Sequence, residues 1–151
     1  MSDRGLWLTK DEGATWQKLG GDEIKNRPGK IVFDPQNSDV FWVSGCYGDA
    51  PIKTDDGGKN FRSLGRLSHA DGVAVDLPDP QRKTLLLGLH EQLQSLHMST
   101  DGGATWTNFG PPTLFKPNGI TYSEKGKCFY GWHLSDNTKL DPPSNFRLGV
   151  K

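Results

Sequence analysis

Short apolar runs recur along the whole chain, and clusters of Gly, Pro, Asn and Asp separate them. Runs of this kind that are rich in β-branched and aromatic residues are typical of β-strands. No stretch shows a sustained helical period with capping residues. We therefore predict an all-β chain, with strands at residues 6–9, 15–19, 30–34, 40–44, 50–53, 60–64, 72–76, 84–89, 94–98, 105–109, 119–123 and 127–132.

One motif, [Ser/Thr]-x-Asp-x-Gly-x-[Thr/Asn]-aromatic, occurs three times at a constant spacing of 45 residues. A short carboxylate that opens a tight turn can accept hydrogen bonds from the turn's own N–H groups. Glycine permits a positive φ where a Cβ would clash, and the aromatic residue is suited to packing between neighbouring repeats. The structural residues predicted in this way are Asp11, Gly13 and Trp16, then Asp56, Gly58 and Phe61, then Asp101, Gly103 and Trp106. A shorter repeat, Asp34-Pro35-Gln36 and Asp79-Pro80-Gln81, has the same spacing.

These three motifs resemble the Asp-box, or BNR, repeat of sialidase-like β-propellers. The resemblance implies propeller blades of four strands each, with the box as a folding device on the blade periphery and any active site on the opposite face. The rival interpretation is that the boxes bind calcium. Each box supplies too few oxygens for the six to eight ligands of Ca²⁺, so we predict neither a metal nor a cofactor.

The repeat divides the chain into a half-blade at 1–20, blades at 21–65 and 66–110, and a partial blade with a tail at 111–151. Asp141-Pro142-Pro143 stands where a fourth box would fall, so that box is absent or degenerate, although residues 145–149 echo 60–65 and can supply one outer strand. About three four-stranded blades cannot close a ring, because propellers need about four to eight. We predict a homodimer whose half-blades complete one another in a six-bladed ring; another assembly, or a fragment of a longer protein, is the alternative.

The loops between blades and the loops that follow each second strand gather at one mouth of a propeller. Here they contain the ligand-binding candidates Arg27, Tyr47, His69, His90, Trp132 and His133, and the candidate catalytic carboxylates Asp49, Asp71 and Glu91. Gly88-Leu89-His90 aligns with Gly131-Trp132-His133, which predicts equivalent positions for the two histidines.

Three chemistries fit such a mouth. They are a transition-metal site, a carboxylate pair that hydrolyses a glycosidic bond, and a wet, aromatic-lined recognition surface. The plainer alternative is that these residues only solvate the mouth.

The family comparison narrows the function. Sialidases have an Arg-Ile-Pro motif and an arginine triad, whereas Arg27 here precedes Pro28 and no Arg-Ile-Pro occurs. Xyloglucan-cleaving relatives use two full propellers, which 151 residues cannot build. We therefore predict a non-catalytic binding or scaffold module that recognises carbohydrate or protein through the mouth. The alternative is a glycoside hydrolase, sialidase-like or xyloglucanase-like, or a fragment of one.

The 18 basic and 18 acidic side chains leave no net charge, so we predict no nucleic-acid or anionic-membrane partner. No apolar run is long enough to cross a bilayer. The first eight residues lack a secretion signal, which predicts a cytoplasmic protein or a fragment of a secreted one. Cys46 and Cys128 are expected at opposite strand ends of non-adjacent blades, so we predict two free thiols.

Overall fold

The structure, a computed structural model, describes residues 5–20, 24, 27–46, 51–89, 95–108, 119–132 and 145–149. These residues form thirteen strands and contain no helix. The strands are β1 (Leu6–Leu8), β2 (Gln17–Leu19), β3 (Arg27–Asp34), β4 (Asn37–Cys46), β5 (Ile52–Thr54), β6 (Arg62–Ser63), β7 (Ala70–Val75), β8 (Leu85–Leu89), β9 (Leu96–Ser99), β10 (Thr107–Asn108), β11 (Gly119–Ser123), β12 (Cys128–Trp132) and β13 (Asn145–Gly149). The all-β prediction is confirmed for this part of the chain.

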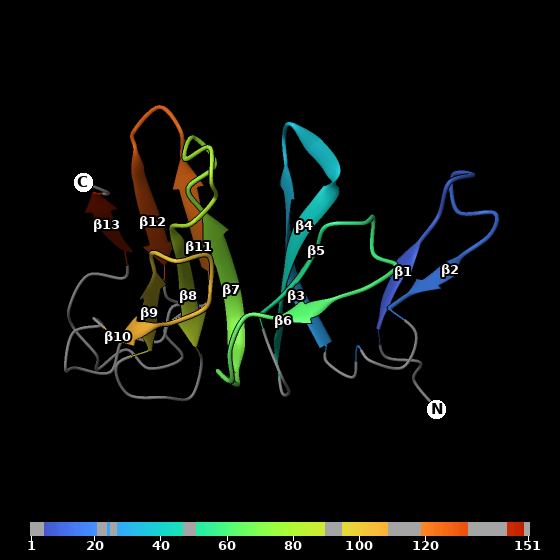
Figure 1. Cartoon of the computed structure of the whole chain (residues 1–151), viewed down its shortest axis with the longest axis horizontal. Helices are drawn as coiled ribbons and strands as arrows, with labels where there is room; N and C mark the ends of the chain where they lie inside the picture. The colour runs from blue at the N-terminus through green and yellow to red at the C-terminus, as the bar shows by residue number, and fades with distance from the viewer. Residues whose placement is uncertain are drawn as a thin grey trace.

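The strands form four antiparallel groups that follow the chain order: β1–β2, β3–β6, β7–β10 and β11–β13. Figure 1 shows these groups side by side, with β1–β2 at one end of the molecule and β11–β13 at the other. The second and third groups are also joined, because Gly45 of β4 pairs with Ala70 of β7. Each group is a meander of neighbouring strands, which is the strand arrangement of a propeller blade.

The outer strands are shorter than the sequence predicts. β6 and β10 have two residues each, because Asn60 and Thr105, which the prediction placed in these strands, are bonded to the box aspartates instead. The tail also differs from its prediction as an outer strand. β13 pairs directly with β12, with Asn145 opposite Trp132 and Gly149 opposite Cys128, and so takes the third place in its blade.

Apolar side chains fill each junction between neighbouring groups. The first cluster joins Leu6 and Leu19 to Phe41 and Val43, and the second packs Trp42 and Leu64 against β7 and β8. The third contains Ala74, Leu86, Leu96, Ile120 and Phe129. Full burial of one such side chain contributes roughly 1.5–3 kcal/mol, so the junctions between blades are the main source of stability. Cys128 is buried and is not in a disulfide.

The inner strands β3, β7 and β11 approach one another closely. A Cβ on Gly29 would lie 2.9 Å from the carbonyl oxygen of Asp71, and one on Gly72 would lie 2.8 Å from the side chain of Ile120. Glycine is therefore required where these strands meet. The Lys30 ammonium of β3 donates to the carbonyl of Ile120 in β11, and burial lowers the pKa of Lys30.

Candidate functional site

The strand registers bring the predicted mouth to one end of the blades. Arg27 at the start of β3 lies opposite Cys46 at the end of β4, Ala70 lies opposite Leu89, and Gly119 lies opposite Trp132. The inner strand of each blade therefore begins where the second strand ends. These paired strand ends are the ones that border the predicted mouth.

Only some of the predicted site residues lie in the described part of the chain. His69, Asp71 and Trp132 are described, and Arg27 has a described backbone in β3. Tyr47, Asp49, His90, Glu91 and His133 lie outside the described residues. The roles assigned to all of these residues stay predictions.

His69 and Asp71 stand on either side of the first residue of β7. His69 has a positive φ of 62°, and its Nδ1 lies 3.1 Å from the hydroxyl of Ser68. The carbonyl of Asp71 accepts a hydrogen bond of 2.9 Å from the hydroxyl of Ser44 in the preceding blade. The backbone that presents the Asp71 carboxylate is thereby fixed by two blades.

Trp132 ends β12 with 43% of its surface exposed. A Cβ placed on Gly119 would lie 2.0 Å from the indole ring, so the ring rests against the bare backbone of the inner strand. In the last blade Trp132 pairs with Gly119 of the inner strand. In the preceding blade Gly88 pairs with Gly72, the equivalent glycine of that inner strand. This register corrects the sequence alignment by one residue, because Trp132 takes the position of Gly88 and not that of Leu89.

The three boxes form the same turn. In each, the Thr or Ser hydroxyl accepts the N–H of the box glycine at 2.8, 3.0 and 2.8 Å, and donates to the aspartate at 2.9, 2.8 and 2.8 Å. The aspartate accepts the N–H four residues later at 2.8, 3.0 and 2.9 Å. The glycines Gly13, Gly58 and Gly103 have φ of 96°, 87° and 91°. The donors of these hydrogen bonds to the carboxylate all lie within the same turn.

The aromatic residues of the boxes do not all behave alike. Phe61 packs edge-on against Phe41 in the first junction, and the Trp106 indole donates to the carbonyl of Leu64 at 2.6 Å in the second. Trp16 is 57% exposed and bonds to Gly13 of its own turn. The expectation of an anchor between blades is therefore wrong for Trp16, because no described strand precedes its half-blade.

The box carboxylates are expected to make folding acid-sensitive. Hydrogen bonds lower the pKa of Asp56, chiefly from the Asn60 N–H, and of Asp101, chiefly from the Thr105 hydroxyl, to about 2 from 3.8. A carboxyl group whose pKa is lower in the folded state contributes stability above its unfolded pKa, and this contribution disappears as the pH falls toward the folded value. Urea unfolding should therefore lose stability between about pH 4 and pH 2.

The Asp101→Asn variant should lose part of this acid dependence, because the amide oxygen does not titrate. An NMR titration in which Asp101 protonates near its ordinary value of 3.8 would contradict the expectation.

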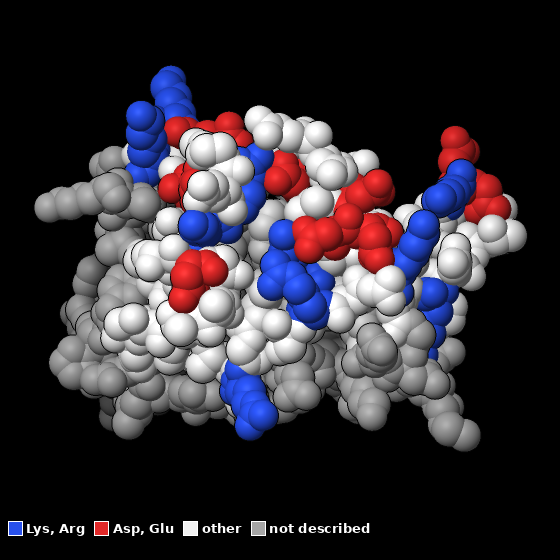
Figure 2. All heavy atoms as spheres, in the orientation of Figure 1, with Lys and Arg blue, Asp and Glu red and all other residues white. Residues whose placement is uncertain are grey.

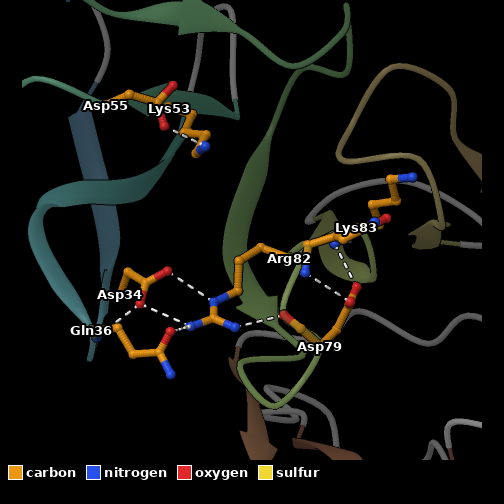
Figure 3. A network of polar contacts seen from close by, with 8 residues as sticks. Asp34, Gln36, Lys53, Asp55, Asp79, Arg82 and Lys83 are labelled. Carbon is orange, nitrogen blue, oxygen red and sulfur yellow. Dashed lines mark hydrogen bonds and ion pairs between the residues drawn. The ribbon is translucent and has the colours of Figure 1, made fainter.

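A polar link between blades was missed by sequence reasoning. The Arg82 guanidinium donates to Asp34 from Nε at 2.8 Å and from Nη2 at 3.0 Å, to Gln36 at 3.2 Å, and to the carbonyl of Asp79 at 2.6 Å (Figure 3). Arg82 has a positive φ of 51°. The sequence contains a signal for this link. The two copies of the Asp-Pro-Gln motif are followed by different residues, Asn37 in the first copy and Arg82 in the second.

One face of the molecule carries charges of both signs (Figure 2). Figure 2 shows basic and acidic side chains close together across the face in view. Within the described ranges, no group of three or more His, Cys, Asp or Glu side chains is arranged to hold a metal ion. The same ranges contain no helix of the length and apolarity needed to span a membrane.

Sequence comparison finds no matching family model. The chain is 36% identical over 118 residues to a xyloglucanase of Paenibacillus sp, covering 78% of this chain and 9% of that enzyme. It is 28% identical over 105 residues to the xyloglucanase Xgh74A of Acetivibrio thermocellus, covering 68% of this chain and 9% of that enzyme. The matched segments thus span about a tenth of the length of these curated relatives.

Solved structures of GH74 enzymes have the same fold over most of the chain. The GH74 enzyme of Niastella koreensis gives a TM-score of 0.68 at 18% identity, covering 83% of this chain and 21% of that one. The GH74 xyloglucanase of Xanthomonas campestris gives 0.65 at 18% identity, covering 96% and 26%. The chain therefore has the fold of a propeller segment, and its sequence is similar to a segment of xyloglucanases.

Proposed function

We propose that this chain is a substrate-binding segment of a xyloglucanase-type propeller, and that it holds a xyloglucan chain at the mouth formed by the strand ends of its blades. The sequence similarity to xyloglucanases over most of the chain supports this proposal. It favours a role in polysaccharide processing over recognition of a protein.

Trp132 supplies the binding surface. An aromatic ring offers a large apolar face with little conformational freedom to lose, which suits the apolar face of a sugar ring. The contact with Gly119 already fixes the indole of Trp132, and 43% of its surface is open. The side chain is therefore prepared for stacking before a ligand arrives.

Hydrolysis requires two carboxyl groups on either side of the glycosidic bond. Asp71, whose carbonyl accepts a hydrogen bond from the Ser44 hydroxyl, is the predicted carboxylate within the described residues. Asp49 and Glu91 stay the candidates for its partner. The proposal therefore assigns sugar binding to the mouth and assigns turnover to Asp71 together with one of these two residues.

Affinity electrophoresis in gels with and without tamarind-type xyloglucan tests the proposal. The wild type should be retarded, and Trp132→Ala should bind at least about ten-fold more weakly, as expected for an aromatic anchor worth about 1.4 kcal/mol or more. Trp16→Ala is the matched control, because Trp16 is also exposed but lies in a box turn. Equal mobility of the wild type in both gels, or equal retardation of both variants, would refute the assignment.

Release of reducing ends from xyloglucan tests the catalytic part separately. Turnover that is lost in Asp71→Asn while gel retardation is kept would place Asp71 in the chemistry. Turnover that Asp71→Asn leaves unchanged would remove Asp71 from it.

A further inference from the structure

The two ends of the row of blades expose apolar side chains. At one end, Ile31 and Phe33 of β3 are 37% and 54% exposed, and with Trp7 of β1 they line a groove of about 330 Å³. At the other end, Tyr130 of β12 is 41% exposed. Figure 1 shows β1 and β12 at opposite ends of the molecule. Exposed apolar surfaces of this kind mark interaction sites.

Inside the row, the positions equivalent to Ile31 and Phe33 are covered. Ile31 pairs with Val43 in the second strand of its blade, as Val73 pairs with Leu87 in the next. Val73 and Val75 are 0% and 1% exposed, because Trp42 of the preceding blade packs in the same cluster. Ile31 and Phe33 face the side on which no inner strands are described.

Tyr130 is equivalent to the residues that cover these positions. Trp42, Leu86 and Tyr130 lie opposite Val32, Ala74 and Thr121 at the same place in their blades. Trp42 packs onto β7 and β8, and Leu86 packs onto Ile120 and Phe129 of the next blade. Both are at most 1% exposed. Tyr130 has the same position without a following blade among the described residues.

We propose that a second copy of this chain occupies the groove, so that β11–β12 of each copy stack on β3–β4 of the other, with Tyr130 seated on Ile31 and Phe33. Each copy provides one groove and one Tyr130 face. Two copies therefore form two identical junctions, and the ring closes at two because no face is left over. The junction repeats the packing that the two complete inner junctions already show.

The strand β13 sets a condition on this pairing. It lies along the edge of β12 at which β1 of the other copy would complete the blade. Within the described residues, β1 is paired only with β2. Formation of the ring therefore exchanges β13 for β1 of the other copy, and the ring is expected to depend on protein concentration.

Light scattering after size exclusion, over a dilution series, tests the proposal without any sugar. The concentrated wild type should have the mass of two 16.7 kDa chains. Phe33→Lys and Tyr130→Asp should each have the mass of one chain. An equal mixture of these two variants should regain the mass of two, because one junction is then unaltered and the other joins Lys to Asp.

Arg62→Ser is the control and should stay dimeric, since Arg62 is exposed in the outer strand β6 of a blade that already has a neighbour on each side. Both test positions are exposed, so circular dichroism should show unchanged folding, and Phe33→Ser with Tyr130→Ser provides a milder pair. A wild type of single-chain mass at every soluble concentration would overturn the proposal. So would masses that rise beyond two chains, or a mixture of the two charged variants that stays monomeric.

Discussion

Replacing Arg82 by methionine is expected to remove about 2–3 kcal/mol from the free energy of unfolding, because a nearly buried carboxylate loses its only charged hydrogen-bond donor shown in the structure. The side chains of Arg82 and Asp34 are each 10% exposed. The Arg82 hydrogen bonds are the main cause that lowers the pKa of Asp34. Methionine replaces the unbranched stem of arginine as far as the Nε position and removes the fork that bonds both oxygens of Asp34. Urea unfolding at neutral pH measures the loss.

The matched control is Arg62→Met. Arg62 lies 3.6 Å from Asp55, and these side chains are 55% and 53% exposed. An exposed pair of this kind contributes about 0–1 kcal/mol. If Arg82→Met lowers the free energy of unfolding no more than Arg62→Met does, the link between Arg82 and Asp34 stabilises the protein no more than an exposed ion pair.

The Asp34→Asn variant makes the argument quantitative. In a double-mutant cycle, Arg82→Met should cost much less in the Asp34→Asn background than in the wild type, because no buried charge is then left without a partner. Additive losses would show that Arg82 acts through its bond to the Asp79 carbonyl instead.

Sequence reasoning predicts most of the repeated features of this chain, which are the box turns and the strands. It predicts few of the features that occur only once. The box turns follow from Asp, Gly and Ser/Thr at fixed spacing, since their hydrogen bonds stay within seven residues of chain. The strands follow from apolar runs between turn formers. Both kinds of feature depend on local chemistry, which a single sequence contains.

The missed features depend on how distant segments meet. Arg82 reaches Asp34 across 48 residues from a backbone position with positive φ, which no propensity indicates for arginine. The one-residue difference at Trp132 depends on its pairing with Gly119, and the place of β13 depends on which edge of β12 is open. The candidate site shares this limit, since sequence order locates its loops at one end of the blades and leaves the directions of their side chains undetermined.

Replacing Gly103 by alanine is expected to cost about 3 kcal/mol, of which about 1 kcal/mol is the strain of a positive φ and the rest is overpacking. Gly103 has a φ of 91°, and an added Cβ would lie 2.8 Å from the Cβ of Leu64. Leu64 is 1% exposed and belongs to the second cluster, so it has no space into which to move. The box glycine therefore has two separate functions: it permits the turn, and it lets the neighbouring blade approach.

The first box separates these two functions within the same protein. Gly13 has a φ of 96°, but the nearest atom to an added Cβ is 3.9 Å away, on the exposed Trp16. Gly13→Ala should therefore cost only the strain, about 1 kcal/mol, and so should Gly102→Ala, where no atom lies within 4 Å. Urea midpoints of the three variants, compared at a dilution at which the protein has the mass of one chain, measure the difference. Equal losses at Gly103 and Gly13 would mean that the box glycine acts through its backbone alone, because the blade packed against Gly103 would then have yielded without cost.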